Sequence, residues 1–211
     1  MGSSTILDII GSFFVGGLLL VSCLQLKLGT TENQFVYNSS VNLQVNLVTL
    51  TTRMEDDFRK IAYCQNAEIT PAANAVLFAD TSTFRFKGDM NNDGTMDSLE
   101  YSFGNTYVPG NTRIKAIVRK YWAGSSTAVV DSFKVGATQM FFRYKTANTD
   151  SSILTTPVNL QQKAIGVIDL SISLESPSRI IDTSHSFIQD TSLYKVYWRQ
   201  FRVVGKNLLY R

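Results

Sequence analysis

The sequence is poor in the residues from which most active sites and metal centres are built. Its 211 residues include one histidine and two cysteines. A zinc site, a Ser-His-Asp triad or a disulfide framework would each have few of these side chains to draw on. We therefore expect a protein that is not an enzyme, with no catalytic residue to name.

An excess of either charge is also lacking. The chain has 20 Lys and Arg against 17 Asp and Glu, which gives a formal net charge of +3. It has no long basic run that could follow a phosphate backbone. Nucleic acid is therefore not an expected partner.

Charge is absent altogether from one long stretch near the N-terminus. Residues 9–26 read IIGSFFVGGLLLVSCLQL, and Asp8 and Lys27 lie on either side. This length suits a single pass through a bilayer. A cleaved secretory signal would have a basic region before the apolar run and a small-residue cleavage site after it, and neither is seen. We expect residues 1–28 to form an apolar helix that contacts the membrane through residues 9–26.

A second helical pattern follows the apolar run. Apolar residues recur at steps of three and four, and polar residues fill the positions between them, a pattern typical of a helix face that packs on a domain core. The apolar positions are Leu43, Leu47, Leu50, Met54, Phe58 and Ile61. We expect residues 29–64 to continue the first helix as an amphipathic half, with any interruption at Thr30 to Gln34.

Two details of this helix carry further expectations. At about 1.5 Å per residue, Cys23 and Cys64 would lie roughly 60 Å apart in one helix, far beyond the ~7 Å limit for a disulfide. Two unpaired thiols are therefore expected.

A cluster of charged residues lies near the end of the predicted helix. Glu55, Asp56 and Asp57 precede Arg59 and Lys60 at helical spacing, which favours a solvated charged face.

Residues 65–211 predict a β-rich head. Short apolar runs alternate with turn residues such as Pro109-Gly110 and Gly124-Ser125-Ser126, and the single His185 lies in a Ser/Thr-rich stretch typical of a surface loop. The expected strands are residues 83–87, 98–103, 114–122, 139–145, 166–174 and 193–204. Together with the helix they predict an α+β fold, with an antiparallel sheet packed on the apolar stripe.

A calcium-binding pattern lies between the first two of these strands. Residues 89–100 fit D-x-[DN]-x-[DN]-G-x5-E in full, with oxygen-bearing side chains at calcium-ligand spacing and Gly94 at the sharp turn. The candidate ligands are Asp89, Asn91, Asp93, Thr95, Asp97 and Glu100. The alternative is a β-hairpin in which Asp93-Gly94 supplies the turn and no metal binds. If Ca²⁺ binds, we expect it to stiffen the loop.

Several of these features resemble type IV pilins and the pseudopilins of type II secretion. Residues 4–8, STILD, are similar to the family's Phe-Thr-Leu-Ile-Glu at the mature N-terminus, with Asp8 in the acidic position. Residues 54–63 are similar to the Asp-Leu-Arg-x-Ala-Gly-Tyr stretch common in minor, J- or W-type members. Residues 140–144 and 165–172 resemble two strands of those heads. The resemblance covers the chain in patches from Ser4 to about Leu174.

The resemblance implies a structural subunit of a pilus-like or pseudopilus filament. Such a subunit is anchored in the inner membrane of a bacterium and then polymerises, with itself or with homologous pilins, into a periplasmic or extracellular filament. Asp8 would meet the N-terminal amine of a neighbouring subunit and set the axial register. A physical reason for Asp8 also exists without the family resemblance, because an acid at the edge of a membrane helix costs a few kcal/mol unless it has a partner. The alternative is that Asp8 is an interfacial residue in the first turn of a helix and has no role in assembly.

One alternative function remains beside the filament subunit. The chain could be a single-pass, membrane-anchored extracytoplasmic binding domain with a calcium-stiffened loop that never polymerises. An anchored hydrolase is the least favoured function, since the available acids cluster in the calcium-like loop or on the helix.

Overall fold

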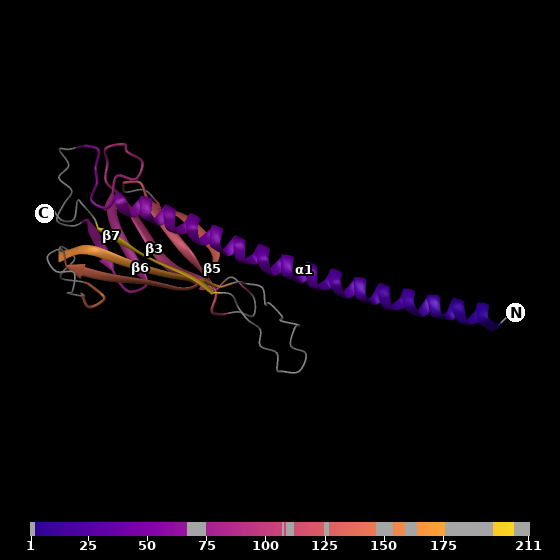
Figure 1. The fold of residues 1–211 in the computed structure, drawn as a ribbon. Coiled ribbons are helices and arrows are strands. Elements are labelled where there is room, and N and C mark those ends of the chain that lie inside the picture. Colours follow the sequence, from indigo (N-terminus) through magenta and orange to yellow (C-terminus); the bar gives the residue numbers. More distant parts are fainter. Residues whose placement is uncertain are drawn as a thin grey trace. The chain divides into compact units, whose positions relative to one another are not determined.

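The computed structural model describes residues 3–66, 75–106, 108, 112–124, 127–146, 154–158, 164–175 and 196–204. His185 and the turn Pro109-Gly110 lie outside these residues. The described elements are α1 (Ser3–Arg59), β1 (Val76–Ala79), β2 (Thr83–Gly88), β3 (Asp97–Thr106), β4 (Lys115–Trp122), β5 (Val129–Thr146), β6 (Ile165–Glu175) and β7 (Val196–Val204) (Figure 1). The chain divides into two compact units, Met1–Asn42 and Leu43–Arg211.

The first unit contains the N-terminal part of α1, and its apolar side chains are exposed. Phe13 is 83% exposed and Leu18 is 55% exposed. The helix continues through Thr30 and Thr31, whose hydroxyls donate to the carbonyl oxygens four residues earlier at 2.8 and 2.9 Å. The expected interruption at this point is therefore not seen, because these polar side chains bond to their own helix.

The second unit contains an antiparallel sheet in which every strand pairs with the next one along the chain, in the order β1 to β7. The long strand β5 pairs with β4 through its first half and with β6 through its second half. Gly136 lies between the two halves with a φ of +80°, and a Cβ there would lie 2.3 Å from the carbonyl oxygen of Glu175. Only glycine fits this close approach, so the sheet can bend at this point.

The C-terminal part of α1 covers one face of the sheet. The apolar stripe is buried, with Met54 and Phe58 fully inaccessible. The ring of Phe58 lies at the centre of an aromatic cluster, 5.6 to 6.3 Å between centroids from five rings of the sheet: Phe84, Phe86, Tyr101, Phe142 and Phe201. Rings at these distances add about 0.5–1.5 kcal/mol per pair beyond the area they bury.

A buried ion pair beside this cluster joins the helix to the sheet. Asp57 is 7% exposed and accepts hydrogen bonds from Arg119 Nε at 2.8 Å and from the Tyr101 hydroxyl. Burial and the charge of Asp57 raise the pKa of Tyr101, so the hydroxyl stays a donor. Burial alone would lower the pKa of Arg119, but its hydrogen bond to Asp57 and the charge of Asp57 raise it. The expectation of a solvated face was therefore wrong for Asp57.

The structure confirms the predicted α+β fold, with three differences in detail. The helix ends at Arg59, five residues before the predicted boundary, and Ala62 then adopts a φ of 59°. β1 is an additional strand of only four residues. β5 begins at Val129, before the predicted start at Gln139. The sequence pattern missed its N-terminal half because that half is mostly exposed and lacks the alternation of a half-buried strand.

The ion pair predicts a large loss of stability when its acid is removed. Asp57→Ala leaves the Arg119 guanidinium and the Tyr101 hydroxyl buried without their acceptor, which costs about 3–5 kcal/mol. Denaturant unfolding of the full-length protein in detergent would measure the loss. Asp56→Ala, at the neighbouring exposed position, is the matched control. Equal unfolding midpoints for the two variants would contradict a structural role for the pair.

The packing of α1 also predicts how truncated chains behave. A chain that lacks residues 1–28 keeps the stripe and all seven strands, so we expect a soluble, cooperatively folded monomer. A chain that begins at Gln65 loses the stripe, and three buried Leu or Phe side chains alone are worth roughly 4–9 kcal/mol, close to the whole stability of a domain. We expect it to aggregate, as judged by light scattering and circular dichroism. If both chains fold equally well, the helix is not part of the core.

Candidate functional site

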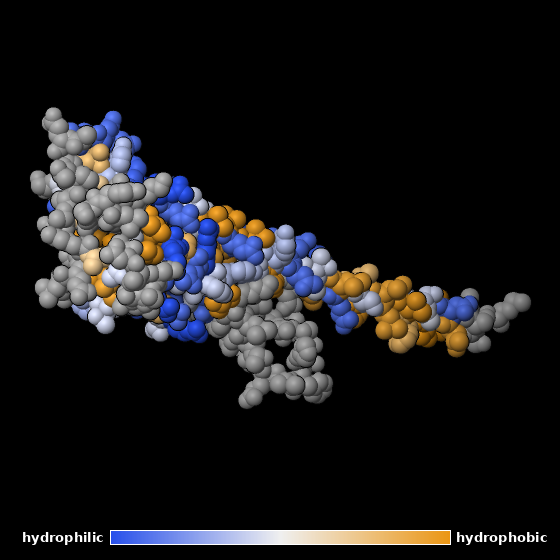
Figure 2. Space-filling model, turned by 60° about the vertical axis from the view of Figure 1, so that its left-hand side comes forward, coloured by the Kyte–Doolittle hydropathy of each residue, from blue (hydrophilic) through white to orange (hydrophobic). Residues whose placement is uncertain are grey.

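The apolar stretch of α1 is the first candidate site, because its large apolar side chains are exposed. The helix is long and apolar enough to cross a membrane, and none of its most apolar window is buried. Figure 2 shows that hydrophobic residues gather along the N-terminal part of the helix. The hydroxyls of Ser12 and Ser22 donate to the carbonyl oxygens of Asp8 and Leu18, at 2.8 and 2.9 Å. The only hydroxyl donors of residues 9–26 are thus satisfied within the helix, as an apolar environment requires.

The glycines of this stretch leave a hollow on its surface. An apolar hollow of about 430 Å³ is lined by Ser12, Phe13, Gly16, Gly17 and Leu20. A Cβ placed on Gly16 or Gly17 would meet nothing within 4 Å. No described residue of this unit therefore requires glycine at these positions, whereas the close approach of a second helix would.

Asp8 lies just before the apolar stretch, on the exposed surface of the helix. Within the described part of the chain, no cation forms an ion pair with its carboxylate. An acid at the end of an apolar segment is stabilised by water, by lipid headgroups or by a cation from another molecule. This geometry leaves Asp8 available for a partner outside its own chain.

The acidic loop between β2 and β3 is the second candidate site, and its two buried carboxylates are already occupied. Asp89 is fully buried and accepts the backbone N–H groups of Gln65, Asp93 and Gly94 at 3.0 to 3.1 Å. This carboxylate thereby fastens the loop to the chain that follows α1. The carbonyl oxygen of Tyr63 accepts the N–H of Asp89 at 2.8 Å and strengthens the same junction.

Asp97 holds the other end of the loop in the same way. It is fully buried and accepts the N–H groups of Met90 and Gly124 and the hydroxyl of Tyr121, at 3.0 to 3.2 Å. Burial and the hydrogen bond to Asp97 raise the pKa of Tyr121 to about 12, so this hydroxyl also stays protonated.

The remaining candidate calcium ligands do not converge with these two. Asp93 is exposed and bonds to Thr95 and Asn91, which lower the pKa of its carboxyl. Glu100 lies on β3 and pairs with Lys120 at 2.9 Å. Among the residues described, no group of three or more His, Cys, Asp or Glu is arranged to hold a metal ion. Calcium binding stays a prediction, while the hairpin alternative gains support from the φ of +81° at Gly94.

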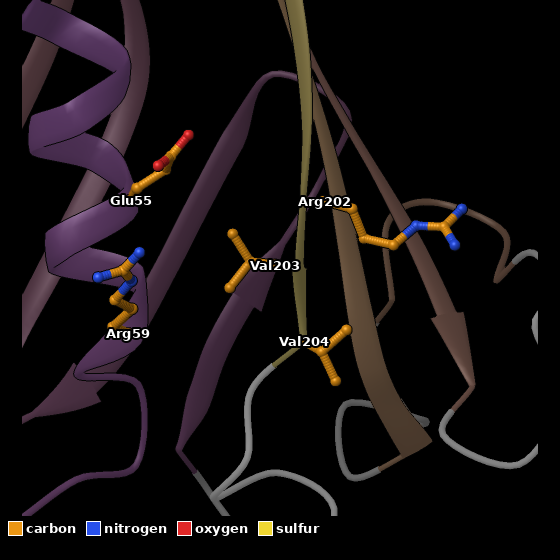
Figure 3. Close-up of a pocket in the computed structure, with 5 residues that line it drawn as sticks. All are labelled: Glu55, Arg59, Arg202, Val203 and Val204. Carbon is orange, nitrogen blue, oxygen red and sulfur yellow. The ribbon is translucent and has the colours of Figure 1, made fainter.

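A small cleft lies where the last turns of α1 meet the end of β7. Its volume is about 230 Å³, and its lining residues are Glu55, Arg59, Arg202, Val203 and Val204. Figure 3 shows Val203 directed toward the helix and Arg202 directed away from it. Glu55 pairs with Arg199, and Arg202 pairs with Asp169. The lining residues offer no nucleophile beside a base, so this cleft has no evident catalytic chemistry.

The structure also contains important contacts that the sequence pattern did not reveal. The buried Asp57–Arg119 pair and the bond from Gln65 to Asp89 join residues 62 and 24 positions apart. The only indication of the ion pair in the sequence is that Asp57 lies next to the apolar stripe. Both cysteines are unpaired, as predicted.

Comparisons with known protein families, with curated proteins and with solved structures find no match to this chain.

The loop geometry separates the two hypotheses for residues 89–100. Asp89→Ala removes the fully buried carboxylate that accepts three N–H groups. Each hydrogen bond is worth about 0.5–1.5 kcal/mol, so the variant should lower the melting temperature even in chelator. Asp93→Ala, at an exposed position, should change melting in chelator little.

The same melting measurements, repeated with calcium in place of chelator, test whether the loop binds the ion. A bound ion raises stability by about 2.7 kcal/mol at a hundredfold excess over its Kd, and Asp93→Ala should reduce that gain. If the wild-type protein melts at the same temperature in calcium and in chelator, the calcium hypothesis fails and the loop is a hairpin only.

Proposed function

We propose that this chain is a structural subunit of a type IV pilus-like or pseudopilus filament. In this proposal the apolar half of α1 anchors the subunit in the membrane before assembly and then packs against other subunits in the filament. The β-rich head faces outward. The chain itself performs no catalysis.

The observation that carries the proposal is the contrast between the two parts of α1. The stripe from Leu43 to Ile61 is buried by the sheet, whereas the large apolar side chains from Ile6 to Leu28 are 50–83% exposed. So much exposed apolar surface needs a bilayer or another protein to cover it. A filament subunit uses both coverings in turn, while a simple tether uses only the first.

Two details of the apolar part favour packing against other helices over lipid contact alone. The hollow at Gly16 and Gly17 allows a second helix to approach closely, and helix packing in membranes depends on such small residues. Gly11 also has open space around it. A lone anchor would gain helix propensity from alanine at each of these positions.

Asp8 would then set the register between subunits. Its carboxylate is exposed at the start of the apolar stretch, where it can pair with the N-terminal amine of a neighbour. In the apolar interior of a filament, an unpaired carboxylate costs several kcal/mol, so assembly would favour the one register that pairs it.

This role predicts that Asp8→Ala separates anchoring from assembly. The variant should remain in the membrane fraction, because its apolar area is unchanged, but should yield few filaments by electron microscopy. Asp8→Glu keeps the charge and is the matched control.

Two outcomes have different meanings for the proposal. Normal filament yield from Asp8→Ala would reject the register role but keep the filament. A wild-type protein that stays monomeric in the membrane, with no filament in any preparation, would reject the filament. The anchored binding domain would then be the better account.

A further inference from the structure

Strands β5, β6 and β7 lie side by side in the sheet (Figure 1). The face of these strands opposite α1 carries exposed aromatic rings. Alternate side chains of a strand point to the same face. On this outer face Phe141 pairs with Ser171, which in turn pairs with Gln200. Trp198 lies two residues before Gln200 on β7 and shares its face. Phe141 is 41% exposed and Trp198 is 69% exposed.

The next row of the same face is basic. Arg143 pairs across the sheet with Asp169, and Asp169 pairs with Arg202. Asp169 is buried and forms ion pairs with Arg202 at 2.8 Å and with Lys145 at 3.2 Å. Burial would raise the pKa of Asp169, but these bonds lower it, so the carboxylate stays ionised. Arg202 and Lys145 thus hold one carboxylate, and Arg143 lies across from it, so three cations against one anion leave this part of the face positive.

We define the aromatic–basic face as Phe141, Arg143, Ser171, Trp198, Gln200 and Arg202. The fold does not require its aromatic rings, because the core is filled from the other face by residues such as Tyr197 and Phe201. The ring of Trp198 is exposed and so is available to contact a ligand. Arg143 is exposed and forms no ion pair with any residue that the structure describes.

We propose that the aromatic–basic face binds an acidic polysaccharide composed of uronic-acid sugars. The C–H faces of sugar rings are apolar and stack on exposed aromatic side chains such as Trp198 and Phe141. Hydroxyl and amide groups, as in Ser171 and Gln200, both donate and accept hydrogen bonds and so match sugar hydroxyls. Arginine binds a carboxylate through two parallel hydrogen bonds.

The spacing of these residues favours a polymer over a single sugar. Trp198 and Arg202 are four residues apart on one strand, or about 13 Å at ~3.3 Å per residue. One ring cannot stack on the first and place its carboxylate on the second, whereas a chain of sugars can. Single-stranded nucleic acid fits less well, because it needs cations along its whole path. Here the cations gather at one end and neutral polar groups surround Trp198.

Binding measurements on the full-length protein in detergent micelles would test this proposal. The acidic probe is an oligogalacturonate, and its methyl ester is the matched neutral probe with the same sugar rings. A thymidine oligonucleotide tests the competing polymer. We expect the oligogalacturonate to bind at least tenfold more tightly than the ester, and we expect the difference to shrink at high salt.

Three variants assign the binding to the named residues. Trp198→Ala should weaken oligogalacturonate binding by about tenfold. Arg143→Gln should weaken binding of the oligogalacturonate but not of its ester. Phe78→Ala removes a ring that is 40% exposed on β1, far along the sheet, and should change nothing. Trp198→Ala and Arg143→Gln should melt close to the wild-type temperature, because both positions are exposed.

Several results would overturn the proposal. These are no oligogalacturonate binding at millimolar concentration, equal binding of acid and ester, tighter binding of the oligonucleotide, or unchanged binding by Trp198→Ala. The proposal does not depend on filament assembly, since the head carries this face whether or not the chain polymerises. Failure of one proposal therefore leaves the other intact.

Discussion

The burial of one stripe of α1 is the constraint on which the rest of the head depends. Six apolar side chains from Leu43 to Ile61 form one face of the helix, and the concave arrangement of aromatic residues around Phe58 covers them. Every strand from β2 to β6 contributes at least one buried apolar residue to the same core. Removing the helix would expose this core, so the head and the C-terminal part of α1 form one folding unit.

Polar contacts then determine how the helix sits on the sheet. Apolar packing tolerates small shifts, whereas the buried bonds from Arg119 and Tyr101 to Asp57 need one arrangement of helix and strands. Asp89 performs a similar task beyond the end of the helix, where it binds the backbone of Gln65 and of its own loop. Charge in this head is therefore used to fix the geometry between the helix and the sheet.

The sequence was enough to predict the elements but not the long-range polar contacts. The helical stripe, the six main strands and the turn at Gly94 follow from local periodicity and from glycine's tolerance of positive φ. β1 is short, and the first half of β5 lacks alternation, so neither has a local signal. Asp57 looked like part of a charged surface because Arg119, its partner, comes 62 residues later.

The loop at residues 89–100 shows a second limit of prediction from sequence patterns. A sequence pattern counts oxygen-bearing side chains, but it cannot tell whether they face a cavity or the backbone. In the structure Asp89 and Asp97 each accept three hydrogen bonds from the protein. The pattern thus located a structurally important loop, but the groups that its carboxylates bind are seen only in the structure.

The central claim is that one helix serves two environments, and the native Cys23 offers a direct test. We would compare two nitroxide labels in lipid vesicles. One is attached to Cys23 in a Cys64→Ser variant, and the other to Val48→Cys in a variant with both native cysteines replaced by serine. Val48 lies on the exposed side of the helix, 53% accessible. The account predicts that the label at position 23 collides with dissolved oxygen and is shielded from a water-soluble nickel complex. The label at position 48 should show the reverse, and equal access of nickel to both labels would contradict the account.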